Sequence, residues 1–208
     1  MINASDSLWM LTAAQLRDQV ASTDPTPGGG SVSIVAAALG AASIHKGVVV
    51  SLKKVGADTA RHKNLLDVGS KTAALITSLS ELADDDSRAF RVYLKTRELP
   101  RTTEGEKAAH KTAREAGLVR ATRVPLEAAA AMVQGLEFAE AAAELVDQHV
   151  RSEVLAGGVL LRAAIRSVLL SVDANLPGIA DTALRHALTL QRDQLERVAS
   201  PSVEAPAH

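Results

Sequence analysis

The chain has 208 residues, of which 23 are basic and 24 acidic, and its only aromatic residues are one Trp, one Tyr and two Phe. Helices favour alanine and leucine, whereas strands favour β-branched and aromatic side chains, so this composition argues against a β-sandwich or barrel. The length suits one domain around a single core, and we predict an all-α bundle of about six helices.

The charge balance and the lack of cysteine exclude several classes of function. A formal net charge of −1 gives no global field that would attract nucleic acid or an anionic membrane. The first ten residues lack the order of a signal peptide, and the longest weakly polar stretch, residues 31–44, ends at a histidine and a lysine. Without cysteine there is no disulfide, thiolate nucleophile or cysteine-ligated metal. We expect a cytoplasmic protein that binds neither nucleic acid nor a membrane.

Capping signals and helix breakers organise the first quarter of the chain. Thr12 and Gln15 have the spacing of a capping box, so we expect a first helix from there to about residue 22. Two prolines and three glycines then fall within residues 24–30, which no helix or central strand tolerates. A helix of small residues should follow over residues 31–52.

A seven-residue repeat predicts one long helix, or two collinear helices, over residues 58–97. Its positions alternate steps of three and four through Leu65, Val68, Thr72, Leu75, Leu79, Leu82, Asp86, Ala89 and Tyr93. Such a seam packs against neighbouring helices at a shallow angle. Pro100 should end the helix, because the residue before a proline is pushed out of helical geometry.

The next segment begins with a second capping signal. Thr103 and Glu106 have the capping-box spacing, and we expect the helix that starts there to be kinked or interrupted at Pro125 before it continues to about residue 146. Residues 152–172 are apolar on nearly every face, which is typical of a helix at the centre of a bundle or in an oligomer interface.

The C-terminal part holds a turn, a helix and a tail. A turn at residues 175–178 precedes an amphipathic helix over about residues 181–198. Beyond it, the sequence has two prolines and little to bury. We assign residues 1–199 to one domain and residues 200–208 to a flexible C-terminal tail.

The glycine-rich turn is the first candidate site. Its glycines let successive backbone N–H groups point into one concavity, and the helix start adds partial positive charge, so the turn could hold a carboxylate, a phosphate or a carbonyl oxygen. It lacks the Gly-Lys-Ser/Thr of a Walker loop and the preceding strand of a dinucleotide fingerprint. The alternative is a tight turn that lets two helices cross closely. The candidate binding residues are Pro27, Gly28, Gly29, Gly30 and Ser31.

Asp86 is the candidate for acid–base chemistry. Asp84 and Asp85 are typical of a solvated acidic run, but the repeat places Asp86 on the apolar seam between Leu82 and Ala89. A carboxylate there must be hydrogen-bonded, paired or protonated, and burial raises its pKa toward the range useful for proton exchange. The alternative is a salt bridge to a basic residue on another helix.

Cationic side chains offer weaker candidates. Arg162 and Arg166 lie one turn apart on the most apolar helix and could clamp a carboxylate or phosphate, or pair with acidic residues across an interface. Lys53 and Lys54 could receive an anionic tail or simply be solvated. The six histidines show no metal-binding spacing, so we assign no metal and no cofactor.

Several short motifs follow one another in a fixed order. They are P-T-P-G-G-G-S at 25–31, A-L-G-A-A at 38–42, D-D-S-R-A-F at 85–90, L-P at 99–100, V-P-L at 124–126 and S-E at 152–153, leading to Asn175. In this order the chain resembles the formiminotetrahydrofolate cyclodeaminase / methenyltetrahydrofolate cyclohydrolase family from about residue 16 to residue 195. The glycine-rich turn is the most specific part of the match.

The resemblance implies an all-helical subunit that forms a homodimer and binds a reduced folate near the interface without a metal. Members of the family either expel ammonia from 5-formiminotetrahydrofolate to give 5,10-methenyltetrahydrofolate, or hydrate the methenyl compound to 10-formyltetrahydrofolate. The proton donor and acceptor proposed for the family falls at Asp86. The resemblance also suggests an oxygen-bearing part of the ligand at the glycine turn. The further candidates for folate binding are Lys53, Lys54 and Arg166, for the glutamate tail, with Ser152 and Glu153.

Three positions depart from the family pattern. Val49 and His149 stand where related sequences carry asparagine, and Glu153 stands where they carry aspartate. These replacements favour an alternative, a folate-binding or scaffold relative without turnover. Of the two reactions we favour the cyclohydrolase, because the chain lacks the formimino-transferring domain that often accompanies the cyclodeaminase.

Overall fold

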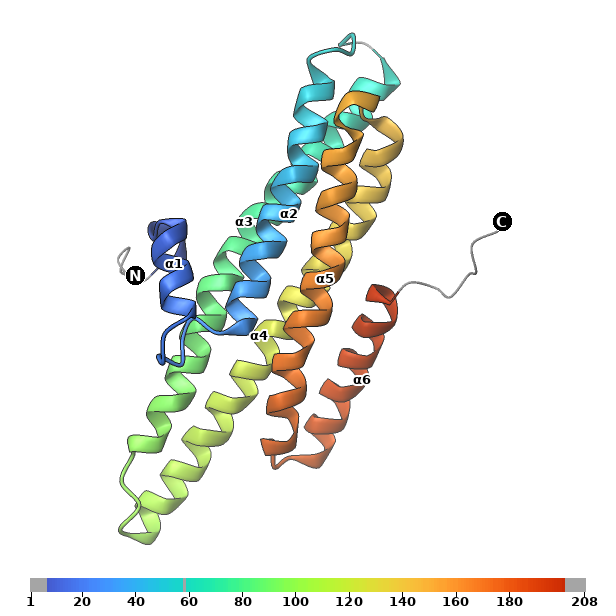
Figure 1. Cartoon of the computed structure of the whole chain (residues 1–208). Coiled ribbons are helices and arrows are strands. Elements are labelled where there is room, and N and C mark those ends of the chain that lie inside the picture. The colour runs from blue at the N-terminus through green and yellow to red at the C-terminus, as the bar shows by residue number, and fades with distance from the viewer. Residues whose placement is uncertain (1–6, 58, 201–208) are drawn as a thin grey trace, which may run out of the picture.

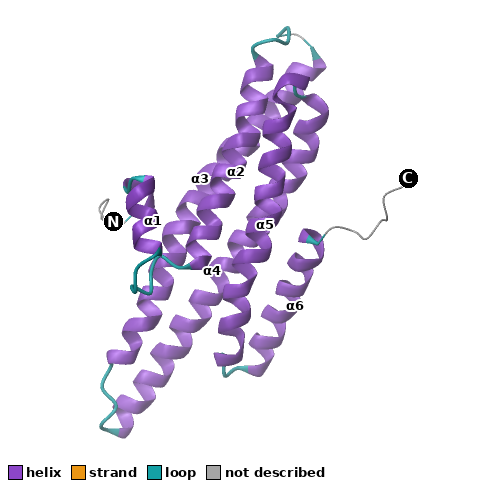
Figure 2. Ribbon diagram, viewed as in Figure 1, coloured by secondary structure: helices purple, strands orange, loops and turns teal. Residues whose placement is uncertain are grey.

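The computed structural model describes residues 7–57 and 59–200, and within them the chain is helical with no strand (Figures 1 and 2). This confirms the predicted all-α class. The α-helices are α1 (Ala13–Val20), α2 (Gly29–Leu52), α3 (Ala60–Lys95), α4 (Glu104–Leu145), α5 (Arg151–Asn175) and α6 (Thr182–Ala199). The single-turn 3-10 helices are η2 (Leu8–Met10), η3 (Thr96–Glu98), η4 (Gln148–Val150) and η5 (Leu176–Gly178).

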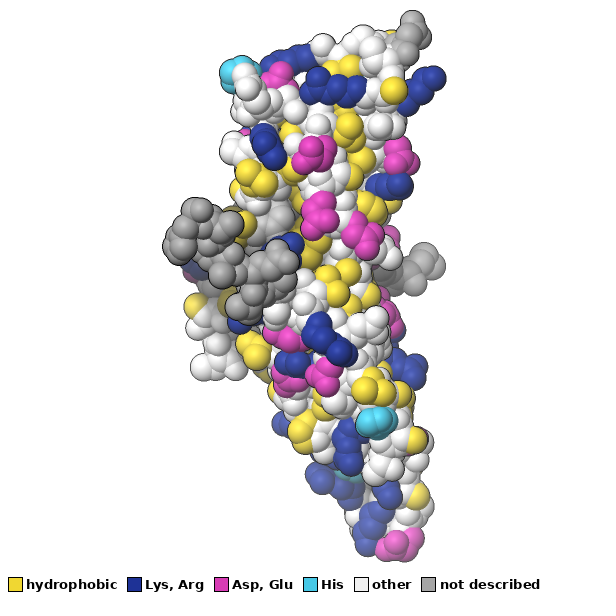
Figure 3. Space-filling model, turned by 90° about the vertical axis from the view of Figure 1, so that its right-hand side faces the viewer, with side chains coloured by type: hydrophobic (Ala, Val, Ile, Leu, Met, Phe, Trp, Pro, Cys, Tyr) yellow, Lys and Arg dark blue, Asp and Glu magenta, His cyan; other side chains and the backbone are white. Residues whose placement is uncertain are grey.

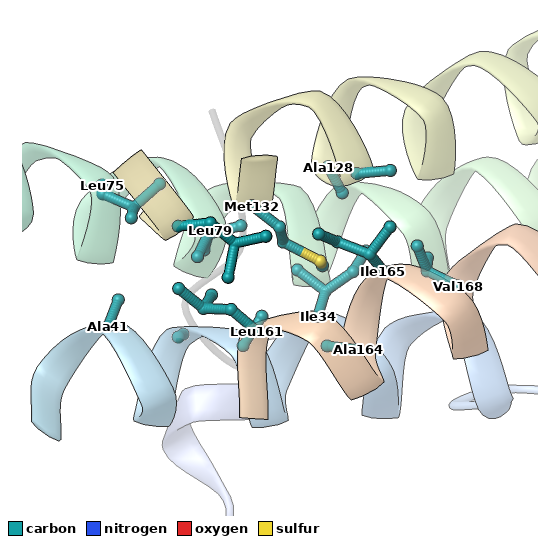
Figure 4. Packing of buried hydrophobic residues seen from close by; sticks show 14 of the residues in the cluster. Ile34, Ala41, Leu75, Leu79, Ala128, Met132, Leu161, Ala164, Ile165 and Val168 are labelled. Atoms are coloured by element: carbon teal, nitrogen blue, oxygen red, sulfur yellow. The ribbon is translucent and has the colours of Figure 1, made fainter. Parts of the chain in front are cut away.

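Helices α2, α3, α4 and α5 form an antiparallel four-helix bundle in which α2 and α4 each pack against both α3 and α5 (Figure 1). The core consists of aliphatic and small side chains from all four helices, including Ile34, Leu79, Met132 and Ile165 (Figure 4). The predicted seam of α3 faces this core. Of its nine positions, only Leu82 and Asp86 are half-buried, and the others are buried.

The outer elements are fixed to the bundle by polar contacts. At the N-terminal end, Asp84 accepts hydrogen bonds from Ser7 Oγ (2.7 Å) and from the backbone N–H of Leu8 (2.8 Å). Helix α6 packs on α5 and α4, and Arg192 donates two hydrogen bonds of 2.8 Å to Asp173 on α5. Helix α1 contains no buried residue.

Local sequence signals set most helix boundaries. Both predicted capping boxes are present, at Thr12 before α1 and at Thr103 before α4. Of the two outcomes expected at Pro125, a kink or an interruption, the interruption is absent, because α4 runs unbroken through this residue. Proline has no N–H to donate to the carbonyl four residues earlier, which is that of Ala121. The side chain of Asn175 donates to this carbonyl instead (3.1 Å), so the missing backbone hydrogen bond is replaced from α5.

Two segments, α2 and residues 148–178, are long and apolar enough to cross a membrane by length and composition. In the structure they belong to the four-helix bundle and are packed against each other. Helix α5 also leaves apolar side chains exposed, among them Val159 and Leu170, which are each 66% exposed. Residues 201–208 of the predicted tail lie outside the described part of the chain.

Candidate active site

A cavity of about 220 Å³ lies where α2 begins and α5 ends. Its wall combines the glycine-rich turn, one face of α3 and α4, and the last turns of α5. The residues lining it are Pro25, Thr26, Gly28, Gly29, Gly30, Ser31, Asp86, Phe90, Ala121, Ser171, Ala174 and Asn175. Ser31 of the turn and Asp86 are 55 residues apart in the sequence, yet they share one cavity.

Asp86 is the acidic side chain of this cavity. Its Oδ2 accepts a hydrogen bond of 2.7 Å from Ser31 Oγ. Burial raises the pKa of the Asp86 carboxyl, and the Ser31 hydrogen bond lowers it by a smaller amount. No basic residue in the described part of the chain forms an ion pair with Asp86, so the salt-bridge alternative is not what the structure shows. A half-buried carboxyl of this kind is suited to proton transfer.

The two neighbouring aspartates have other partners. Asp84 accepts the hydrogen bonds of the N-terminal segment described above, and Asp85 pairs with Arg88 and with Arg120 (3.4 Å). The three consecutive carboxylates therefore point to three different surroundings. Only Asp86 reaches the cavity.

Glycine at position 30 leaves space for the carboxylate. A Cβ atom built on Gly30 would lie 2.8 Å from Asp86 Oδ2 and 3.1 Å from both Asp86 Oδ1 and Ser171 Oγ. Even alanine would therefore displace the acid or its neighbour. A Cβ on Gly29 would meet no heavy atom within 4 Å. Of the consecutive glycines, Gly30 is the one whose missing side chain admits Asp86.

The start of α2 supplies backbone donors. Gly28 is its N-cap and provides no side-chain hydrogen bond. The first N–H groups of a helix have no acceptor within the helix, and among the described residues none accepts from the N–H groups of Gly29, Gly30 or Ser31. These groups, together with the positive end of the helix, favour an oxygen ligand at the turn.

The structure adds wall residues that we did not predict as site residues. Ser167, Ser171 and Asn175 recur every four residues along α5, and this polar stripe in an apolar helix is a signal that the sequence contains. Ser171 and Asn175 line the cavity, while Ser167 accepts a hydrogen bond from Ser33 (2.8 Å). Phe90 lies one turn beyond Asp86 on α3, and it is the aromatic residue of the wall. Pro27 is buried and is not among the lining residues.

Other predicted site residues gather at the opposite end of the bundle. Lys54 pairs with Asp147 (3.2 Å), and Glu153 pairs with Lys46 (2.8 Å) and accepts a hydrogen bond from Ser43 (3.1 Å). The hydrogen bonds from Lys46 and Ser43 lower the pKa of Glu153. Ser31 and the pair Lys53 and Lys54 lie near opposite ends of α2, about 33 Å apart at a helical rise of about 1.5 Å per residue. The binding roles predicted for Lys53, Lys54, Ser152 and Glu153 stay predictions.

The two arginines of α5 do not form a joint anion clamp within the described chain. Arg162 lies 3.7 Å from Glu140 of α4, and Arg166 lies 3.9 Å from Glu196 of α6. Neither lines the cavity that contains Asp86. The departures at Val49, His149 and Glu153 likewise lie in the end of the bundle that holds Lys53, away from Asp86 (Figure 1).

Comparison with known proteins gives consistent matches. The sequence profile of the family described as Formiminotransferase-cyclodeaminase matches residues 12–194. A methenyltetrahydrofolate cyclohydrolase of Methylorubrum extorquens is 32% identical over 168 residues, which cover 80% of this chain and 79% of that protein. The formimidoyltransferase-cyclodeaminase of Sus scrofa is 29% identical over 172 residues, which cover 80% of this chain but 31% of the pig protein.

A solved structure shows the same fold. The crystal structure of formiminotetrahydrofolate cyclodeaminase from Thermotoga maritima superposes with a TM-score of 0.79 at 24% sequence identity. The match covers 92% of this chain and 91% of that chain. The helical arrangement is therefore shared over nearly the whole length of both chains.

Proposed function

The chain belongs to the formiminotransferase-cyclodeaminase family, and we propose that it hydrolyses 5,10-methenyltetrahydrofolate to 10-formyltetrahydrofolate with Asp86 as general acid/base. The observation that carries the proposal is the cavity in which the Asp86 carboxyl meets Ser31 and the free N–H groups at the start of α2. The cyclohydrolase of M. extorquens, most of whose length this chain covers, supports the choice of reaction.

Hydrolysis of the methenyl bridge requires three proton transfers. Water bonds to the carbon between the two nitrogens and gives up its first proton, which the ionised Asp86 carboxylate accepts. The resulting hydroxyl loses the second proton as one carbon–nitrogen bond breaks, so the formyl group stays on the other nitrogen and the departing nitrogen gains a proton. Because the substrate loses its positive charge, one proton is released overall. A carboxyl whose pKa is raised by burial exchanges protons with such groups more readily than a solvated one.

The same cavity could serve cyclodeamination, the activity named for the Thermotoga maritima protein. There, the aniline nitrogen N10 attacks the formimino carbon that the ring nitrogen N5 carries, and the carbon–nitrogen bond to the departing ammonia breaks after that nitrogen is protonated. Both reactions place the same demand on Asp86, which is a proton donor and acceptor beside the one-carbon unit. Assays with both substrates distinguish them.

The first experiment follows the near-ultraviolet band of methenyltetrahydrofolate, which disappears on hydrolysis. Asp86→Asn keeps the size of the side chain but removes its basicity, and general acid–base catalysis contributes about 100- to 10,000-fold. We expect a loss of this size in kcat.

Ser31→Ala removes a hydrogen bond that lowers the pKa of Asp86, so the rising limb of the pH–rate profile should move to higher pH.

Two results would contradict the proposal. Full activity in Asp86→Asn would exclude Asp86 as the acid/base. If the wild-type protein binds tetrahydrofolate but accelerates neither reaction, the alternative of a folate-binding relative without turnover is correct. Circular dichroism of each variant controls for folding, and Ser33→Ala removes a nearby hydroxyl of α2 that bonds Gly29 and Ser167 rather than Asp86.

We also propose a homodimer in the cytoplasm. Leu39 of α2 and Leu155, Val159 and Leu170 of α5 are more than half exposed, and a second subunit that covered them would remove this apolar surface from water. In a dimer, the distant Lys53 and Lys54 could approach the Asp86 cavity of the other copy. The cytoplasmic location rests on the cysteine-free sequence.

A further inference from the structure

Phe90 and Tyr93 of α3 and Arg97 of η3 form a row of aromatic and cationic side chains, called the ladder below, that starts at the cavity wall. Phe90 lines the cavity, and its ring centroid lies 6.0 Å from that of Tyr93. The guanidinium carbon of Arg97 lies 5.8 Å from the Tyr93 centroid. The sum of these two distances is the upper limit for the separation between the Arg97 guanidinium carbon and the Phe90 ring centroid. A guanidinium thus lies within reach of an aromatic residue of the cavity wall.

Arg97 and its neighbour Arg101 retain uncompensated charge. Both are exposed, and Arg101 donates to the backbone carbonyl of Arg97 (3.3 Å). Within residues 7–57 and 59–200 neither forms an ion pair, although Arg88, Lys107 and Arg120 at this end of the molecule do. A guanidinium without a carboxylate partner is free to bind one on a ligand.

The surroundings of Arg97 are basic as a whole. Over residues 88–123, which form the projecting end of α3 and α4, Lys and Arg outnumber Asp and Glu by more than two to one. Figure 3 shows Lys and Arg side chains gathered toward this narrow end of the molecule. Because the whole chain has a net charge of −1, the positive charge is local to this end.

The size of the cavity decides how a folate can lie. Pockets that enclose a drug-sized ligand hold about 300–1,000 Å³, and this cavity holds about 220 Å³. A folate therefore cannot be enclosed whole. Since the one-carbon bridge must meet Asp86, the pterin end enters the cavity, and the glutamate carboxylates remain outside.

Resting on the proposed function, we propose that Arg97, with Arg101 beside it, binds the glutamate carboxylates of the substrate, and that Phe90 contacts the aminobenzoyl ring. Phe90 and Arg97 are seven residues apart, which is about 10 Å along a helix and is the scale of one aromatic ring and an amide link. Lys53 and Lys54 of the same subunit are too distant to contact the same ligand.

The test measures binding rather than turnover, so that it does not depend on catalysis. Tetrahydrofolate and a tetrahydropterin that ends at the N10 phenyl ring, and so lacks the glutamate, are titrated calorimetrically into the wild-type protein, Arg97→Ala and Arg97→Lys. We expect Arg97→Ala to weaken tetrahydrofolate about 10-fold, the scale of a charged hydrogen bond, and to leave the truncated ligand unchanged. Arg97→Lys keeps the charge but not the bidentate geometry of the guanidinium. Its affinity for tetrahydrofolate should lie between those of the wild type and Arg97→Ala.

Lys95→Ala is the matched control, because it removes one positive charge from the adjacent turn of α3 but not from the ladder. It should bind both ligands as the wild type does. Equal weakening of both ligands by Arg97→Ala, or no weakening of tetrahydrofolate, would overturn the assignment. Failure of the proposed function looks different, because it would appear as absent turnover in the absorbance assay while the Arg97 effect on binding persisted.

Discussion

Helices α2 and α5 meet in two regions that use small residues in opposite ways. In the middle of the bundle, Gly40 and Gly157 let the two backbones touch, and a Cβ on Gly157 would lie only 2.5 Å from the carbonyl oxygen of Gly40. At the end of the same pair of helices, Gly30 leaves room for the Asp86 carboxyl, and Ser171 lies opposite. One region is closed and apolar, and the other holds a cavity.

The difference shows that small residues alone do not make a site. Both regions have glycine on α2 facing α5. The cavity region, unlike the middle of the bundle, contains the start of α2, whose first N–H groups have no partner in the helix. Only there does the adjoining face of α3 carry a carboxyl, which requires a polar neighbour when it is buried. Experiments on matched glycines can separate the two functions.

Among the glycine variants, the largest effect is expected at Gly30. Gly30→Ala would place a methyl group against both Asp86 oxygens and displace the carboxyl. A misplacement of about 1 Å can cost about 100-fold in rate, so kcat in the absorbance assay should fall by about that factor. Gly105→Ala is the control, because Gly105 is also the second residue of its helix and a Cβ there would meet nothing within 4 Å. Unchanged kcat in Gly30→Ala would show that the position of Asp86 is not critical.

The closed region should respond in stability rather than activity. Gly157→Ala would bring a methyl group within 2.5 Å of Gly40 O and of Ile44 Cγ1. Overpacking of this kind costs about 1–3 kcal/mol in the free energy of unfolding. Gly158→Ala meets only Ala139 Cβ at 3.7 Å and should instead gain up to about 1 kcal/mol from helix propensity. Urea denaturation measures the change in the free energy of unfolding, which should be a loss for Gly157→Ala and a gain for Gly158→Ala. Equal changes in the two variants would contradict the close approach of α2 and α5 at Gly157.

The smallest expected effect is a coupling of about 1 kcal/mol between two residues near the cavity, Asn175 and Pro125. If Asn175 replaces the hydrogen bond that Pro125 removes, Asn175→Ala should leave the buried Ala121 carbonyl without a donor. We expect a destabilisation of about 1–3 kcal/mol. In a Pro125→Ala background the backbone N–H returns, so the same change should cost about 1 kcal/mol less. A double-mutant cycle by urea denaturation measures this coupling, and strictly additive effects would show that Asn175 does not compensate for Pro125.

The sequence predicted the elements of the fold closely because their signals are local. The two capping boxes, the long seam of α3 and the glycine turn each depend on residues within a few turns of one another. Of the two outcomes predicted at Pro125, a kink or an interruption, the interruption was wrong for the opposite reason. The side chain of Asn175 replaces the hydrogen bond that Pro125 cannot donate. It lies 54 residues in sequence from the carbonyl that it bonds, and no local pattern reveals that pairing.

The candidate site was predictable only in part. Asp86 stood out because a carboxyl interrupts an apolar seam, and the glycine turn stood out by composition; the structure places both in one cavity. Phe90, Ser171 and Asn175 were missed as site residues, since an aromatic residue or a serine on a core helix is ordinarily part of the packing. Lys53, Lys54, Ser152 and Glu153, which we also predicted as binding residues, lie at the other end of the bundle.

The amino-acid sequence by itself determined the helical class, the approximate helix boundaries and the one carboxyl that the core must accommodate, because periodicity and capping act over a few residues. Which candidates meet was decided by the tertiary structure alone. The cavity exists because α2 begins beside the last turns of α5, and that match depends on how four long helices align along the bundle. Such alignment is set by packing over their whole length, through contacts between residues distant in the chain.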